Sequence, residues 1–246
     1  MTVAVVTGGS RGIGAATARR LAADGWDVAI GYRQDHASAK AVVAEIDAGG
    51  RQAVAVAGDL TTPAPITELF DAAARLGTIG ALVNNAGVVD VAARVDEYDE
   101  ARLQRMFTVN LVGPFLCAGE AVRRMSTRHG GSGGVIVNVS SVASRLGSGG
   151  QYVDYAASKA GIDLLTVGLA QEVVQEGIRV NTVRPGIIRT DIHASGGQPD
   201  RAERLAPKIP MQRPGEPEEI AAAIAWLCSQ ESSYATGATL DVTGGR

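Results

Sequence analysis

Tyr155 and Lys159 lie four residues apart in the segment VDYAASKAG and could together do acid–base chemistry. In a helix this spacing places both side chains on one face. A fixed ammonium beside a phenol favours the phenolate and lowers a pKa that is otherwise ~10. Ser141 precedes them, at the end of the apolar segment VIVNVSS. The three side chains therefore predict a site that moves a proton near neutral pH.

The first fourteen residues, MTVAVVTGGSRGIG, predict an apolar strand, a glycine turn and the start of a helix. Gly8, Gly12 and Gly14 depart from the spacing G-x-G-x-x-G. They nevertheless keep its physical features, which are a tight turn, a close backbone approach and a helix N-terminus. We therefore expect a pyrophosphate to bind at this turn.

The same turn also matches G-x-S-x-G, the nucleophile elbow of α/β hydrolases, with Ser10 as the nucleophile. Such an elbow normally follows a central strand and takes an oxyanion donor from an earlier loop. Almost no chain precedes Ser10 here. We therefore favour a dinucleotide site over a hydrolase.

The end of the second predicted strand, Gly31-Tyr32-Arg33, indicates which dinucleotide is bound. A protein that binds the unphosphorylated dinucleotide usually carries an acidic residue here for the ribose 2′-hydroxyl, and this chain has Tyr32. Arg33 and Arg11 could bind a 2′-phosphate through charge-assisted hydrogen bonds. NADP(H) is therefore favoured over NAD(H). The alternative is that these arginines lie on the solvated surface of an arginine-rich protein.

The elements that must position these residues alternate between short strands and helices. Strands are predicted at 3–6, 28–32, 53–58, 81–85, 135–140, 178–183 and 238–242. Helices are predicted near 13–24, 37–48, 65–76, 99–128, 151–176 and 216–229. This alternation predicts one α/β domain over residues 1–246, with a doubly wound, seven-stranded parallel sheet and helices on both faces. Such a sheet binds ligands beyond the carboxyl ends of its strands.

Composition excludes several other classes of protein. The formal net charge is −3, so neither nucleic acid nor an anionic membrane surface is an expected partner. No stretch approaches the ~20 apolar residues of a membrane span, and we expect a cytoplasmic protein acting on small molecules. Cys117 and Cys228 are predicted to be buried free thiols. The three histidines are isolated in the sequence, so no metal site is expected.

Taken together, these motifs resemble those of the short-chain dehydrogenase/reductase family, and the resemblance covers nearly the whole chain. The shared motifs are TGGSRGIG at 7–14, Asp59-Leu60, NNAG at 84–87, Asn110, Ser141, Tyr155 with Lys159, and RPGIIRT at 184–190. The resemblance implies a single-domain Rossmann-type oxidoreductase that prefers NADP(H). It also implies hydride transfer between the nicotinamide and a carbonyl or secondary alcohol substrate.

The resemblance also implies a role for each catalytic residue. Tyr155 would be the general acid in reduction and the general base in oxidation, and Ser141 would donate a hydrogen bond to the developing alkoxide. Lys159 would lower the tyrosine pKa and bind the nicotinamide ribose, and Asn110 would anchor a water that links Lys159 to solvent. The segment from Ser141 to Tyr155 is one residue longer than is usual in the family, which leaves Ser140 as an alternative to Ser141.

For the cofactor, the resemblance places Asp59 at the adenine, 85–87 along the adenosine, and 185–190 at the nicotinamide. The full set of expected cofactor-binding residues is Gly8, Ser10, Arg11, Gly12, Ile13, Gly14, Tyr32, Arg33, Asp59, Leu60, Asn85, Ala86, Gly87, Tyr155, Lys159, Pro185, Gly186, Ile188 and Thr190.

The substrate itself stays open between an oxoacyl thioester, a sugar, a steroid and a simple ketone. Residues 187–213 are rich in glycine and proline and are expected to form a mobile lid over the nicotinamide end. Tyr152, His193 and Met211 are candidates to face the substrate. The resemblance implies a homotetramer paired through helices near 99–128 and 151–176. A dinucleotide-binding sensor or scaffold without turnover is the alternative function.

Overall fold

The computed structural model describes residues 2–246, and the strands in that range form one parallel sheet of seven. They are β1 (Thr2–Thr7), β2 (Asp27–Tyr32), β3 (Ala53–Ala57), β4 (Thr78–Asn84), β5 (Gly134–Val139), β6 (Ile178–Pro185) and β7 (Thr239–Val242). Their order in the sheet is β3-β2-β1-β4-β5-β6-β7, and every neighbouring pair is parallel. The predicted fold class is therefore confirmed.

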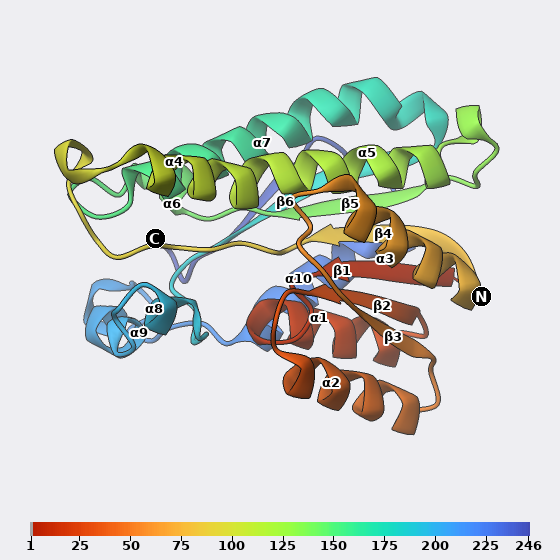
Figure 1. The fold of residues 1–246 in the computed structure, drawn as a ribbon, viewed down its shortest axis with the longest axis horizontal. Coiled ribbons are helices and arrows are strands. Elements are labelled where there is room, and N and C mark those ends of the chain that lie inside the picture. Colours follow the sequence, from red (N-terminus) through yellow and green to blue (C-terminus); the bar gives the residue numbers. More distant parts are fainter. Residues whose placement is uncertain (1) are drawn as a thin grey trace.

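Helices cover both faces of this sheet, as the alternation predicted (Figure 1). They are α1 (Gly12–Ala23), α2 (His36–Ala48), α3 (Pro63–Leu76), α4 (Glu100–Phe107), α5 (Gly113–Met125), α6 (Ala143–Leu146), α7 (Val153–Val173), α8 (Ile192–Ser195), α9 (Arg201–Leu205) and α10 (Pro217–Cys228). Helices α1, α2 and α10 pack on one face, and α3, α5 and α7 pack on the other. The short helices α8 and α9 lie apart from both layers (Figure 1).

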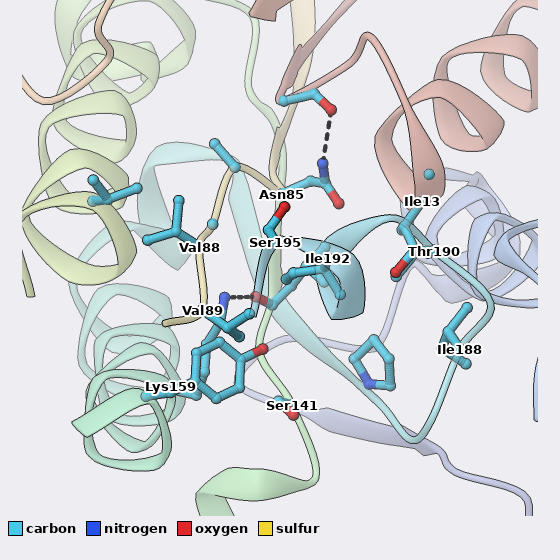
Figure 2. A pocket seen from close by; sticks show the side chains of 18 of the residues that line it. Ile13, Asn85, Val88, Val89, Ser141, Lys159, Ile188, Thr190, Ile192 and Ser195 are labelled. Carbon is cyan, nitrogen blue, oxygen red and sulfur yellow. Dashed lines mark hydrogen bonds between the residues drawn. The ribbon is translucent and has the colours of Figure 1, made fainter. Parts of the chain in front are cut away.

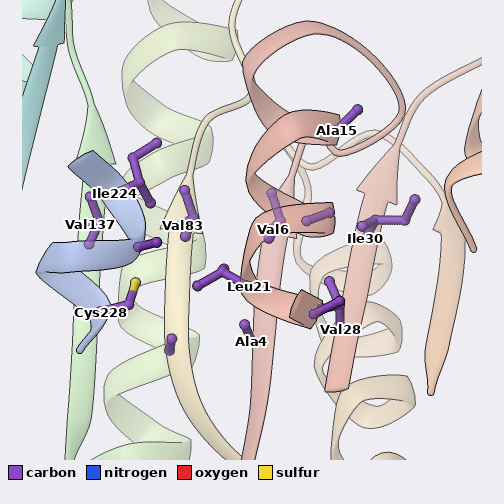
Figure 3. Close-up of a cluster of buried hydrophobic side chains, with 14 of the residues drawn as sticks. Ala4, Val6, Ala15, Leu21, Val28, Ile30, Val83, Val137, Ile224 and Cys228 are labelled. Carbon is purple, nitrogen blue, oxygen red and sulfur yellow. The ribbon is translucent and has the colours of Figure 1, made fainter. Parts of the chain in front are cut away.

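Each face of the sheet has its own apolar core, because strands with helices on both sides bury both sets of alternating side chains. On the α1 and α10 face, Leu21 and Ile224 pack against strand residues such as Val6 and Val83, all of them inaccessible to solvent (Figure 3). This double burial explains why the strands are almost continuous apolar runs in the sequence.

The order of strands places a ligand-binding crevice beside β1. The chain proceeds from β1 outward through β2 and β3, then returns to β4 on the other side of β1. Helices on either side of this reversal point diverge, so the carboxyl ends of β1 and β4 open into a cleft. The glycine turn follows β1 and the NNAG motif follows β4. Both predicted motifs therefore lie at the same edge of the sheet.

The single helix expected over 99–128 is wrong at its centre. Helix α4 ends at Phe107, a π-helical turn covers Thr108–Val112, and α5 begins at Gly113. The cause is the fully buried Asn110, whose Oδ1 accepts from the Val88 backbone N–H at 2.8 Å and whose Nδ2 donates to the Val88 carbonyl at 2.9 Å. A π turn inserts an extra residue into a helix, often at a functional site. Here the π turn contains Asn110, whose side-chain amide is hydrogen-bonded to the loop after β4.

Candidate active site

One cavity of about 900 Å³ lies at the carboxyl edge of the sheet and brings together most of the predicted site residues. In Figure 2, Lys159 and Ser141 lie on one side of it, and Ile188 and Thr190, from the segment after β6, lie on the other. The predicted residues that line it are Gly8, Ser10, Arg11, Gly12, Ile13, Tyr32, Arg33, Asp59, Leu60, Asn85, Ala86, Gly87, Ser141, Tyr155, Lys159, Pro185, Gly186, Ile188 and Thr190. Gly14 and Asn110 are not among the lining residues.

The N-terminus of α1 has the features of an anion site. Within the described chain, no side chain caps this end of the helix, and its first turn carries no acidic residue. The free N–H groups and the positive end of the helix dipole therefore remain available to a ligand. Gly8 has a φ of +65°, and a Cβ there would lie 3.0 Å from the Ala86 Cα. The turn thus presents backbone N–H groups to the cavity, and Gly8 has no room for a side chain.

Thr7 and Asn85 hold the glycine turn against the loop after β4. The Thr7 Oγ1 accepts hydrogen bonds from the backbone N–H groups of Asn85 and Ala86, both at 3.0 Å. The Asn85 Nδ2 donates back to the Thr7 carbonyl at 2.9 Å. Gly14 packs under the turn, where a Cβ would lie 2.2 Å from the Gly8 carbonyl oxygen. Sequence reasoning missed Thr7, although a threonine that ends a buried apolar strand is a signal for such a role.

At the end of the cavity beside β2 and β3, the Arg33 side chain is only loosely paired. Arg33 lies 4.0 Å from the Asp59 carboxylate and is 65% exposed. The Tyr32 hydroxyl is hydrogen-bonded to the Nδ1 of His36 at 2.8 Å. Asp35, which sequence reasoning did not select, also lines the cavity and caps α2 by accepting from the Ser38 N–H. Hydrogen bonding to Ser38 and the nearby Arg11 lower the pKa of Asp35.

The two candidate serines have different surroundings. The Ser140 hydroxyl is buried and donates to the Lys159 backbone carbonyl at 3.0 Å. The Ser141 hydroxyl accepts from the Ala143 N–H at 3.1 Å and lines the cavity, and its polar group lowers the pKa of the nearby Tyr155 phenol. This geometry favours Ser141 as the serine that faces the reaction.

Burial, rather than the ammonium, dominates the pKa of Tyr155 in the protein without ligand. The Lys159 Nζ lies 5.8 Å from the Tyr155 ring centroid and donates to the Val139 carbonyl at 2.8 Å. Burial raises the pKa of Tyr155, and the Ser141 hydrogen bond opposes this only in part. Burial also lowers the pKa of Lys159 to about 8. The expected lowering of the tyrosine pKa by Lys159 is therefore not seen, because desolvation penalises the phenolate more strongly.

The substrate candidates separate into two groups. Tyr152 and His193 line the cavity, whereas Met211 does not and is 61% exposed.

Cys117 and Cys228 are buried free thiols, as predicted, and burial raises the pKa of each to about 12. Within residues 2–246, no cluster of His, Cys, Asp or Glu could hold a metal ion, and no helix is long and apolar enough to span a membrane.

Comparison with known proteins decides the family. Residues 8–246 match the family model described as enoyl-(acyl carrier protein) reductase. The chain is 50% identical to the uncharacterized oxidoreductase YgfF of Escherichia coli K12, over 100% of both chains. The chain belongs to the short-chain dehydrogenase/reductase family.

Two solved structures of the short-chain dehydrogenase/reductase family share this fold. A blue fluorescent protein from a metagenomic library, in complex with NADPH, is 37% identical with a TM-score of 0.89, covering 99% of this chain and 97% of that one. A short chain dehydrogenase from Burkholderia cenocepacia J2315, in complex with NADP, is 36% identical with a TM-score of 0.89, covering 98% and 96%. Family membership supports the dinucleotide interpretation of the glycine turn over the hydrolase one.

In this short-chain dehydrogenase/reductase, a buried ion pair fixes the helix turn that carries Tyr155. The Arg102 Nε of α4 lies 2.7 Å from the Asp154 Oδ2 of α7, and the Asp154 side chain is 0% exposed. The Arg102 guanidinium also lies over the Tyr98 ring at 4.0 Å and donates to the Val91 carbonyl. Asp154 directly precedes Tyr155, so this pair anchors the start of α7 beside the cavity.

We expect Arg102→Met to lower the free energy of unfolding by about 3 kcal/mol, because it leaves the Asp154 carboxylate buried and unpaired. Arg105→Met is the matched control, since Arg105 lies on the same helix, pairs with Asp90 and is 54% exposed. It should cost less than about 1 kcal/mol. Chemical denaturation measures both values, and equal losses would contradict the anchoring role.

Proposed function

We propose that this protein is an NADP(H)-dependent oxidoreductase that acts on a carbonyl or secondary alcohol group, with Tyr155 as general acid and base. The observation that carries the proposal is the pairing of Tyr155 with Ser141 in a cavity that also contains an uncapped helix N-terminus. NADP(H), when bound, would supply or accept the hydride. The known binding of NADPH and NADP by the two solved relatives supports this cofactor.

The residues around the cavity can hold such a cofactor along its whole length. The turn at 8–14 would hold the pyrophosphate, and Asp59, Leu60 and 85–87 would line the adenosine. Residues 185–190 and Lys159 would hold the nicotinamide end. We also propose 1–246 as one domain in which 187–213, with α8 and α9, forms the lid over the cavity.

The protein's own residues would move the proton. The raised pKa of Tyr155 keeps the phenol protonated at neutral pH, which suits donation to a carbonyl oxygen during reduction. Ser141 would donate a hydrogen bond to the oxygen as negative charge develops. Lys159 would stabilise the phenolate left behind, and Asn110 would connect Lys159 to solvent through the loop at Val88. A Cβ at Gly87 would lie 3.2 Å from the Asn110 Oδ1 and 3.5 Å from the Lys159 Nζ, so both side chains reach the same glycine.

Replacing Tyr155 by Phe should leave NADPH binding intact and lower carbonyl reduction at least ~100-fold, because the general acid is removed while the cavity keeps its shape. Steady-state NADPH oxidation with a panel of ketones and aldehydes measures the rate. NADPH fluorescence measures binding.

Wild-type reduction should stay constant up to about pH 7 and fall as the pH passes about 8, because Lys159, whose pKa is lowered to about 8, then loses the charge that stabilises the phenolate. Ionisation of the phenol, whose pKa is raised, should lower the rate further at higher pH. Unchanged turnover in Tyr155→Phe would contradict the assigned role. NADPH binding without turnover of any carbonyl or alcohol by the wild type would instead favour the sensor or scaffold.

We expect Arg33→Ala to raise the KM for NADPH about tenfold or more and to leave the KM for NADH unchanged, because a charge-assisted bond to the 2′-phosphate is lost. Tyr32→Asp should shift the preference in the same direction by repelling that phosphate. Arg75→Ala is the control, since it removes an exposed charge on α3 that does not line the cavity. Equal changes for the two cofactors would contradict the preference for NADP(H).

We also propose a homotetramer that uses the outer face of α5 and α7. Phe115, Leu164 and Val167 are 50%, 73% and 40% exposed on these helices, which lie side by side in Figure 1. Light scattering should give a mass near four times the 25.3 kDa chain. Leu164→Glu should reduce that mass, whereas Val95→Glu, at an exposed position outside both helices, should not. A wild-type mass of one chain would contradict the proposal.

The cytoplasmic location stays a prediction.

A further inference from the structure

Most of the cationic side chains in residues 2–246 are paired with carboxylates, and most of the others line the cavity. Fifteen arginines lie within ion-pair distance of an acidic side chain. Of the eight remaining arginines and lysines, five line the cavity, and these are Arg11, Lys159, Arg201, Lys208 and Arg246. The proposed function already uses two of them, since Arg11 would bind the cofactor and Lys159 would take part in the reaction. The other three are not.

Arg201 is half-buried and contacts an aromatic ring. Its guanidinium lies 5.0 Å from the centroid of the Tyr152 ring, and its Nη1 donates to the Gln198 Oε1 at 3.3 Å. A guanidinium has five N–H donors, so most of its hydrogen-bonding capacity is unused. Burial lowers the pKa of Arg201, and the positive charges of Arg204 and Arg246 lower it further. The protein therefore holds a partly buried cation among other positive charges. An anionic ligand would offset the energetic cost of this arrangement.

Arg201 and Tyr155 lie in the same part of the cavity, so one ligand could contact both. Gln198 donates to the Tyr152 hydroxyl at 2.7 Å, so Gln198 and Arg201 both dock the segment around α9 onto Tyr152. Tyr152 and Tyr155 are three residues apart at the start of α7, and both line the cavity. Tyr152 is the N-cap residue of α7 and Tyr155 lies in its first turn, so both belong to the same end of the helix. A ligand in this part of the cavity can therefore present its carbonyl to Tyr155 and an anionic group to Arg201.

Acidic groups at this end of the cavity are few. Asp191 lines the cavity, but in the described part of the chain it lies within ion-pair distance of none of Arg201, Lys208 and Arg246. Asp35 and Asp59, the other lining carboxylates, lie at the opposite, adenosine end beside Arg11 and Arg33. Among the side chains, this end of the cavity therefore has three cations, Arg201, Lys208 and Arg246, and one carboxylate, Asp191.

We propose that Arg201 binds a carboxylate on the substrate, so that the protein reduces short oxo acids to hydroxy acids, with Lys208 and Arg246 adding to the positive field. This inference rests on the proposed oxidoreductase function. In the reaction, an oxo acid, NADPH and a proton give a hydroxy acid and NADP⁺. The hydride forms a C–H bond at the carbonyl carbon, the π electron pair moves to oxygen, and the oxygen takes the Tyr155 proton. The phenolate is then reprotonated from solvent.

The test uses four oxo acids, 4-oxopentanoate, 5-oxohexanoate, 6-oxoheptanoate and 7-oxooctanoate, each beside its neutral methyl ester. For at least one acid, wild-type kcat/KM with NADPH should exceed that of its ester about tenfold or more, since hydrogen bonds to a charged group are the strong ones. Arg201→Gln should remove this preference, mainly through KM, and leave the ester unchanged. Arg201→Lys should restore part of it, because the charge is kept.

Arg204→Gln is the matched control, because it removes the same charge from the same helix at a position that does not line the cavity. It should keep the preference for the acid. Calorimetric binding of the same four acids to wild type and Arg201→Gln, without turnover, gives a second measurement.

The outcomes separate the two proposals. If esters are reduced as well as acids and Arg201→Gln changes neither, the carboxylate site is overturned and the oxidoreductase stands. If nothing is reduced but an acid binds and the binding needs Arg201, the proposed function fails and the anion site stands. If no acid binds or reacts in preference to its ester, the inference is overturned.

Discussion

The hydrogen bond from the buried Lys159 ammonium to the Val139 carbonyl is the interaction on which the site depends. A buried charge is costly unless it finds polar partners, and this carbonyl supplies one at 2.8 Å. Val139 is the last residue of β5, which is paired on both sides, with β4 and with β6. The ammonium is thus fixed by the most constrained part of the sheet, and with it the turn of α7 that begins at Tyr155.

That turn is held at both ends. Before Tyr155, Asp154 is bound by Arg102 and accepts from the Tyr155 N–H at 2.9 Å. After it, the Lys159 carbonyl accepts from the buried Ser140 hydroxyl. The two adjacent serines therefore have different roles. Ser140 bonds α7 to the end of β5, whereas Ser141 faces Tyr155. Groups held in this way need little rearrangement when charge develops, which is the source of most electrostatic catalysis.

The parts of this arrangement that depend on local patterns could be predicted from the sequence. Apolar runs gave the strands and glycine spacing gave the turn, because both are set by neighbouring residues. The π turn at Asn110 could not be predicted, since its cause is a bond to Val88, 22 residues away in the chain. The pKa of Tyr155 could not either, because helical spacing predicts how near the ammonium lies but not how much water is excluded. Arg201 lies in a segment without periodicity, so nothing in the sequence indicated that it contacts Tyr152.

The charge of the whole chain and the charge of its cavity are different quantities. A net charge of −3 argues against partners as large as nucleic acid or a membrane surface, because these meet the averaged surface field. A small ligand meets only the groups around it, and here the unpaired groups are mainly cations. If NADP(H) binds as proposed, its phosphates would meet α1, Arg11 and Arg33. It would therefore neutralise one end of the cavity and leave Arg201 in an unbalanced positive field. The charge that remains after the cofactor is counted is thus the best physical guide to the substrate.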